Sequence, residues 1–299
     1  MNSRYVASPD LCENPRDLAL VLRSFGPAAG RYLIKYPLKW TSLIEKNTQN
    51  WSPLDLKRAK ELLFEAQNSK RLLDERLLVP KGTKAWNPAF NWNKNLSNLM
   101  VHSCPVIDGV LANSTPEQFD AIEHVTLDDL PFHTNEDETI LSEPAEFQRV
   151  SKYIVKIHTE IVFVDPYLDL SKKAVADSVK EIIKTIPESD CESVKFFVSH
   201  AHVNHTSIQR SLLSLKRLLP STSDVSFVCN LIDDRRSANP MHARYLFGVY
   251  GGIRVDRGFR AHNSKRNDIS PLGQQVVREL VNTYISTHQT LDIVDTFKV

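Results

Sequence analysis

Long apolar runs and paired cysteines are missing from this chain of 299 residues. No uninterrupted apolar run approaches the ~20 residues that a membrane-spanning helix needs. The opening stretch, MNSRYVASPDLCENPRD, lacks the apolar core of a secretory signal. The four cysteines form no CxxC pair, which argues against a zinc site built on thiolates; they are Cys12, Cys104, Cys191 and Cys229. These absences predict a cytoplasmic protein with reduced, buried thiols and no membrane insertion.

Glycine is also scarce, with nine in the whole chain, and it is unevenly placed. Four of the nine fall within one short stretch: Gly248, Gly251, Gly252 and Gly258. Glycine is favoured where the backbone needs a positive φ or a close approach. Residues 248–258 are therefore predicted to hold the most specialised backbone of the chain.

The net charge of +1 hides a strong asymmetry along the sequence. Residues 1–100 carry 16 Lys and Arg against 9 Asp and Glu, residues 101–150 carry 1 against 11, and residues 151–299 carry 20 against 16. The acidic belt around TLDDLPFHTNEDETILSEP is interpreted as a solvated linker. The alternative is an electrostatic lid or a docking strip for a basic partner.

The hydrophobic pattern predicts an α/β protein of two domains, residues 1–146 and 147–299. The first is expected to be mainly helical, with a helix that begins at Ser52 and Pro53, followed by the acidic linker. The second alternates buried apolar runs with amphipathic ones, which predicts strands at 161–165, 194–199 and 225–231 in a mostly parallel sheet. In such sheets functional side chains collect at the carboxyl ends of the strands.

Polar residues follow these predicted strands in a pattern that suits phosphate chemistry. The candidates are Asp165, the group His200, His202 and His205, and the pair His242 and Arg244. A histidine can act as nucleophile or general acid on a phosphodiester. A nearby arginine can grip the phosphate with two hydrogen bonds. We therefore expect Asp165, His242 and Arg244 to lie within one side-chain reach, beside His200 or His202.

The stretch PMHARYLFGVYGGIRVDRGF and the strand order before it resemble single-motif members of the phospholipase D-like superfamily. The resemblance covers about residues 147–290. It implies a phospholipase D-like α/β domain in which His242 attacks phosphorus and a second histidine, from another subunit, protonates the leaving oxygen. Active members have HxK, four residues, then Asp; here Arg244 takes the lysine position and Val249 the aspartate position. The candidate replacements for that aspartate are Asp165, Asp256 and Asp268.

From this resemblance the chain is expected to bind a phosphodiester, with nucleic acid favoured by the basic first hundred residues. The context it implies is a subunit of a bacterial defence or DNA-processing assembly, a homodimer or larger hetero-complex that needs no cofactor. The alternative is an active, metal-independent phosphodiesterase or nuclease that uses His242 across a homodimer. Further substrate contacts are expected from His200, His202, Arg254 and Arg257.

A different interpretation comes from the sequence FFVSHAHVNH. Its residues His200, His202, Asn204 and His205 resemble the HxHxDH metal motif of metallo-β-lactamase-fold hydrolases. Asn204 stands where that family has aspartate, and the chain lacks the glycine-rich hairpins that its fold needs. This metallo-hydrolase remains a minor alternative.

Overall fold

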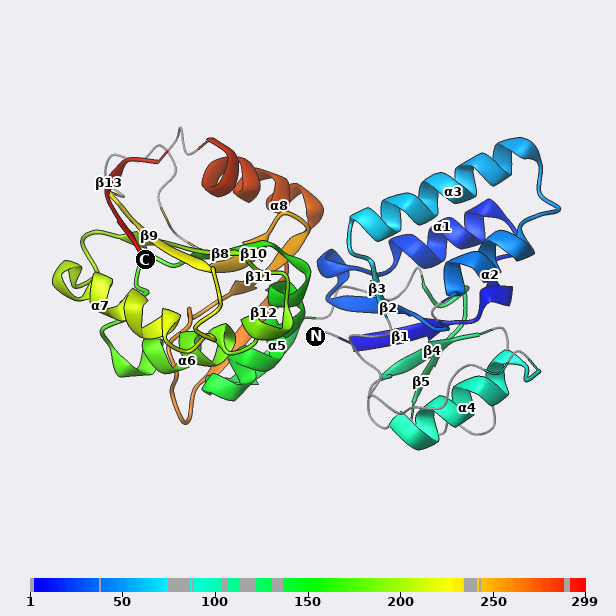
Figure 1. The fold of residues 1–299 in the computed structure, drawn as a ribbon, viewed down its shortest axis with the longest axis horizontal. Helices are drawn as coiled ribbons and strands as arrows, with labels where there is room; N and C mark the ends of the chain where they lie inside the picture. Colours follow the sequence, from blue (N-terminus) through cyan, green and yellow to red (C-terminus); the bar gives the residue numbers. More distant parts are fainter. Residues whose placement is uncertain are drawn as a thin grey trace. The chain divides into compact units, whose positions relative to one another are not determined.

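The computed structural model describes residues 3–37, 39–74, 87, 89–103, 107–112, 122–130, 137–233, 241, 243–287 and 291–299. The chain divides into two compact units, an N-terminal one that ends at residue 135 and a C-terminal one that begins at residue 136 (Figure 1). Strand β6 (Glu138–Leu141) and the first turn of α5 (Pro144–Ile157) belong to the second unit. The unit boundary thus falls before the residue 146/147 boundary expected from the sequence.

The described residues of the N-terminal unit form a five-stranded sheet in the order β3-β2-β1-β4-β5, and every pairing is parallel. The strands are β1 (Ser3–Ala7), β2 (Arg31–Lys35), β3 (Leu72–Asp74), β4 (Gly109–Leu111) and β5 (Glu123–Val125). The sequence interpretation recognised helices here and missed this sheet. The N-terminal unit is therefore itself an α/β layer structure.

Helices cover both faces of that sheet (Figure 1). Those on one face are α1 (Pro15–Arg23), α2 (Trp40–Asn47) and α3 (Pro53–Asn68), and α4 (Trp92–Ser103) lies on the other. Alternate side chains of β1 face opposite ways, because Tyr5 packs with α1–α3 while Val6 packs with α4. The predicted start of α3 is confirmed, since the Ser52 hydroxyl accepts a hydrogen bond from the Asp55 N–H at 3.2 Å.

The C-terminal unit holds a mixed sheet, which the described residues build in the order β13-β9-β8-β7-β10-β11-β12-β6. Its strands are β6 (Glu138–Leu141), β7 (Glu160–Val164), β8 (Ser193–Ser199), β9 (Ser226–Ile232), β10 (Tyr245–Gly248), β11 (Gly251–Val255), β12 (Arg266–Pro271) and β13 (Ile293–Lys298). The three strands predicted from the sequence correspond to β7, β8 and β9, which pair in parallel. The other pairings are antiparallel. The expectation of a mostly parallel sheet is therefore wrong for this unit, because β10 and β11 return through a tight hairpin rather than a helical crossover.

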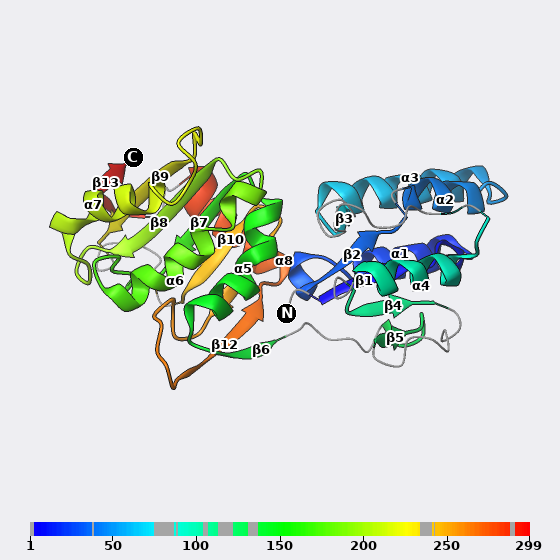
Figure 2. The same cartoon turned by 60° about the horizontal axis from the view of Figure 1, so that its bottom comes forward.

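In the described residues, helices cover both faces of this mixed sheet (Figure 2). The first face carries α5 (Pro144–Ile157), α6 (Lys173–Ile183) and α7 (His205–Lys216), and the second carries α8 (Gln274–Val281). Strand β7 serves both layers, since Phe163 packs with α5–α7 and Val164 packs with α8. Within the described part of the chain, no helix is long and apolar enough to cross a membrane.

The described cysteines are buried and free, as the sequence analysis expected of its thiols. They are Cys12, Cys191 and Cys229. Burial raises the pKa of Cys12 and of Cys229 to about 12, and that of Cys191 to about 11. These thiols therefore stay protonated at neutral pH and act as core side chains. Cys104 lies outside the described residues.

Candidate functional site at the carboxyl edge of β7, β8 and β9

Four neighbouring strands place polar residues at one edge of the C-terminal sheet. Asp165 follows β7, His200 follows β8, and Asp233 follows β9. Arg244 directly precedes β10, which runs antiparallel to β7, so it reaches the same edge. Side chains two positions away along these strands all pack in the α5–α7 core: Phe163, Val198, Leu231 and Leu246. The alternation of side chains therefore directs the four polar residues to the α5–α7 face.

Asp165 and Arg244 meet at the centre of this edge. The Arg244 Nε lies 3.7 Å from Oδ1 of Asp165, whose side chain is only 5% exposed. The Tyr167 N–H donates a hydrogen bond to the same carboxylate oxygen at 2.9 Å. Burial raises the pKa of Asp165, and the Tyr167 N–H and the Arg244 charge oppose that rise. The Arg244 Nη1 also donates to the carbonyl of Asp256 at 2.6 Å, so the guanidinium is held from two sides.

An aromatic side chain that the sequence analysis did not single out lies beside Arg244. Tyr167 is 52% exposed. Its ring centroid lies 4.6 Å from that of His202 and 5.5 Å from Cζ of Arg244. His202, Tyr167 and Arg244 thus form a row of two rings and one cation at the edge of the sheet. The signal for Tyr167 was its place three residues after the end of the buried strand β7.

Gly258 makes room for the Asp165–Arg244 pair. Its φ is +71°, a conformation that side chains with a Cβ rarely adopt. A Cβ at this position would lie 2.4 Å from Oδ2 of Asp165 and 2.8 Å from Cδ of Arg244. The cluster of glycines noted in the sequence thus supplies one backbone position that the site requires.

The three histidines after β8 make three different contacts. The Nε2 of His200 lies 3.7 Å from Oδ1 of Asp233, His202 packs on Tyr167, and the Nε2 of His205 donates to the His200 carbonyl at 2.6 Å. Among the described residues, no group of three His, Cys, Asp or Glu side chains is arranged to hold a metal ion. The metallo-hydrolase interpretation needs three converging imidazoles, and this geometry gives it no support.

Three more of the predicted positions lie away from the Asp165–Arg244 pair or outside the described residues. His242 is outside the described residues. Arg254 is exposed and, by its alternation with Ile253 and Val255, projects to the α8 face. Arg257 is exposed, and its backbone N–H donates to Oδ1 of Asn267. Neither guanidinium makes a hydrogen bond or ion pair with a described residue of this site.

The three candidate replacements for the missing aspartate lie at different places in the C-terminal unit and make different contacts. Asp165 lies at Arg244, whereas Asp256 contributes its backbone carbonyl. Asp268 accepts a hydrogen bond from the Thr139 hydroxyl at 2.6 Å, on the β6–β12 pair. Val249 is exposed in the turn between β10 and β11, at the far end of β10 from Arg244.

Comparisons with known proteins give only distant matches. No family model matches the chain, and no curated protein matches it. Among solved structures, Nuc from Salmonella typhimurium, a phospholipase D family member, matches with 8% identity and a TM-score of 0.33, over 53% of this chain and 98% of its own. TrmBL2, an archaeal chromatin protein described as showing a novel mode of DNA binding, matches with 12% identity and a TM-score of 0.32, over 84% and 70%. Such low scores do not establish a shared function.

Proposed function

We propose that the C-terminal unit binds a phosphodiester of nucleic acid at the carboxyl edge of β7, β8 and β9, with Arg244 as the main phosphate ligand. The observation that carries this proposal is the way Arg244 is held. Its Nε faces Asp165 and its Nη1 donates to the Asp256 carbonyl, while its side chain remains 26% exposed. No acceptor for Nη2 is found among the described residues. A guanidinium fixed in this way presents donors for a phosphate without losing side-chain freedom on binding.

The aromatic neighbour of Arg244 supports nucleic acid over a lipid headgroup. Tyr167 lies beside the guanidinium and is half exposed. Aromatic rings next to phosphate-binding cations suit a nucleotide, because every base has a π-face that stacks on such a ring. The excess of 16 Lys and Arg over 9 Asp and Glu in residues 1–100 also favours a polyanion.

We propose that this binding is non-catalytic and that the protein acts as a subunit of a defence or DNA-processing assembly. Val249 is the reason to expect no catalysis, because it occupies the position of the phospholipase D-like aspartate and cannot orient an imidazole. One observation favours a second candidate, a phosphodiesterase. His200 and His202 lie at the same edge of the sheet as Arg244, so more than one imidazole is available near the proposed phosphate.

Replacing Arg244 by alanine is expected to weaken binding of single-stranded DNA or RNA by about 1.5–3 kcal/mol, or ~10- to 150-fold. The loss follows from removing a charged hydrogen-bond donor from the phosphate. Fluorescence anisotropy with a labelled oligonucleotide measures it. Arg254→Ala is the matched control, since it removes the same charge from the α8 face. Equal affinities for Arg244→Ala and wild type would reject the proposal.

Incubating the protein with labelled DNA and RNA, with and without divalent metal, is expected to give no cleavage. His242→Ala separates the two candidates because the family's reaction needs that imidazole as nucleophile. Cleavage by wild type that His242→Ala abolishes, with the fold intact by circular dichroism, would replace the binding role by the phosphodiesterase. In that case a twofold dimer with the two His242 side chains facing each other is expected.

A further inference from the structure

A groove runs between α6 and α7 on the α5–α7 face of the C-terminal unit. Its volume is about 310 Å³. Its polar lining consists of two cations and four hydroxyls: Lys180, Arg210, Ser171, Ser207, Ser211 and Ser214. On α7 the three serines recur about once per turn, so they form one stripe along the helix. We call this feature the α6–α7 groove.

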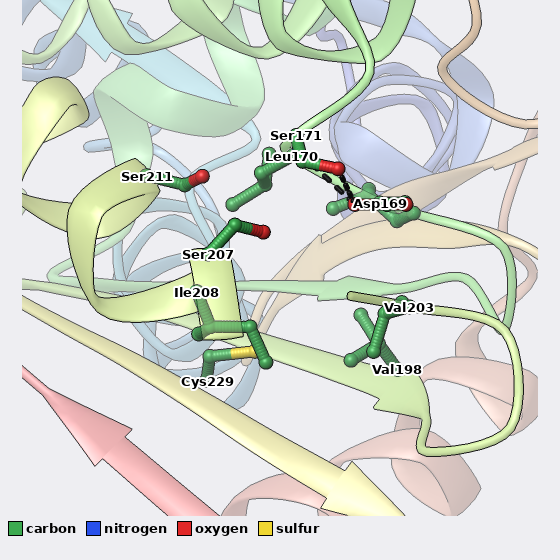
Figure 3. A pocket seen from close by; sticks show the side chains of 10 residues that line it. Asp169, Leu170, Ser171, Val198, Val203, Ser207, Ile208, Ser211 and Cys229 are labelled. Atoms are coloured by element: carbon green, nitrogen blue, oxygen red, sulfur yellow. Dashed lines mark hydrogen bonds between the residues drawn. The ribbon is translucent and has the colours of Figure 1, made fainter. Parts of the chain in front are cut away.

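The inner end of the groove closes over an apolar floor. A hole of about 10 Å³ lies there, between Val198, Ile208 and Cys229 (Figure 3). Figure 3 shows Ser207 and Ser211 of α7 turned toward the loop that carries Ser171. The space is too small for more than about one water, so a ligand of the groove lies above this floor.

Four donors of the groove have no hydrogen-bond or ion-pair partner among the described residues. The Ser171 hydroxyl donates to Asp169, and the Ser207 hydroxyl donates to the Asn204 carbonyl. By contrast, four other side chains of the lining make no hydrogen bond or ion pair within the described part of the chain: Lys180, Arg210, Ser211 and Ser214. Two unneutralised cations and two free hydroxyls therefore face a common space.

The charge around the groove has one sign on the α7 side. No Asp or Glu occurs from Ser199 to Ser223, a stretch that includes all of α7. On α6 the acids are Asp177, which does not line the groove, and Glu181, which pairs with Lys184. The groove is thus complementary to an anion that extends along the helices.

One chain segment connects the groove to the site at Arg244. The loop after β7 passes from Asp165 and Tyr167 at the site to Leu170 and Ser171 in the groove. Both features lie on the α5–α7 face. With a volume of about 310 Å³, the groove is too small to admit a duplex and suits a single strand.

We propose that the α6–α7 groove continues the phosphodiester site, so that one nucleic-acid strand with a phosphate at Arg244 places further phosphates at Arg210 and Lys180. This inference rests on the proposed function and adds the substrate class, an unpaired strand several nucleotides long. The free hydroxyls of Ser211 and Ser214 donate to the same backbone. An isolated phosphate or a mononucleotide reaches only the Arg244 end.

The test compares oligothymidylates of about 4 and about 16 nucleotides, the range of single-strand site sizes for small binding domains. The variant Lys180→Ala/Arg210→Ala is expected to bind the longer strand at least about 10-fold more weakly, since two phosphate contacts are lost. The slope of log affinity against log salt is expected to shrink by about 1.4, from ~0.7 per contact on a single strand. Binding of the shorter strand is expected to be unchanged.

The control is Arg254→Ala/Arg278→Ala, which removes two exposed arginines from the α8 side. The proposal that the α6–α7 groove binds the strand is overturned by either of two results. One is an equal loss of affinity in this control, and the other is an unchanged affinity of Lys180→Ala/Arg210→Ala for the longer strand. If Arg244→Ala weakens binding while the groove variant does not, the groove proposal is rejected and the proposed function at Arg244 stands. If Arg244→Ala is also without effect, the proposed function fails with it. Tighter binding of a duplex than of a single strand would contradict the inference that the ligand is an unpaired strand.

Discussion

Gly258→Ala is expected to destabilise the C-terminal unit by about 2–5 kcal/mol and to abolish most of the proposed phosphate binding. The φ of +71° costs a residue with a Cβ about 1–2 kcal/mol. The added methyl also falls 2.4 Å from Oδ2 of Asp165. That carboxylate is buried and held by backbone N–H groups of Tyr167 and Phe259, so it cannot move aside without losing them. Overpacking of this kind adds about 1–3 kcal/mol.

Thermal or urea unfolding followed by circular dichroism measures the stability loss, and oligonucleotide anisotropy measures the binding loss. Gly273→Ala is the matched control. Gly273 precedes α8 with φ −61°, and nothing lies within 4 Å of a Cβ placed there. Its substitution is expected to cost less than about 1 kcal/mol. Equal stability of the two alanine variants would show that Gly258 is not required by the Asp165–Arg244 pair.

The alternation of apolar runs was enough to predict β7, β8 and β9, because each is a buried strand followed by an amphipathic helix. The pairing of the remaining strands was not readable in the same way. Strands β10 and β11 form a hairpin, and β6 and β13 join the sheet from distant parts of the chain. Periodicity states that a segment is a strand, but its direction and neighbour depend on contacts distant in sequence.

The N-terminal sheet escaped prediction because its strands are short. Three of them, β3, β4 and β5, have only three residues each, which is too few to show a period of two. The helices around them carry a much longer signal. The helix expected to begin at Ser52 and Pro53 was therefore recognised, while the strands of the sheet were not.

The contact between Asp165 and Arg244 was expected because both residues were taken to follow strand ends. Their side chains lie 3.7 Å apart, although Arg244 directly precedes β10 and reaches this edge because β10 runs antiparallel to β7. Tyr167 was not identified, because its exposure and its contact with Arg244 depend on the loop conformation after β7. Gly258 was part of a recognised glycine cluster, but its partner lies 93 positions earlier in the chain and is visible only in three dimensions.

His158 joins α5 to the β10–β11 hairpin in the C-terminal unit. The side chain is fully buried. Its Nε2 accepts a hydrogen bond from the Tyr250 N–H at 2.9 Å, so the ring proton lies on Nδ1, which donates to the Ile154 carbonyl at 2.6 Å. The ring of Tyr250 also stacks on it, with centroids 5.3 Å apart. A neutral imidazole of one defined tautomer therefore links the helix end to the hairpin turn.

His158→Ala is expected to cost about 3–5 kcal/mol of unfolding free energy, because it leaves a cavity and removes the partner of two backbone groups. Gly248→Ala is expected to be destabilising as well, since its Cβ would lie 2.3 Å from Cδ2 of the His158 ring. In the double variant that clash is gone, although the Glu160 carbonyl at 2.7 Å still crowds the methyl. The double variant is therefore expected to lose less unfolding free energy than the sum of the two single losses. The difference is expected to be about 0.5–3 kcal/mol in a double-mutant cycle measured by urea unfolding. Strict additivity would show that Gly248 does not accommodate the His158 ring. The exposed residue His262 provides the control variant, His262→Ala. If His158→Ala were as stable as wild type and this control, the imidazole would not link α5 to the hairpin.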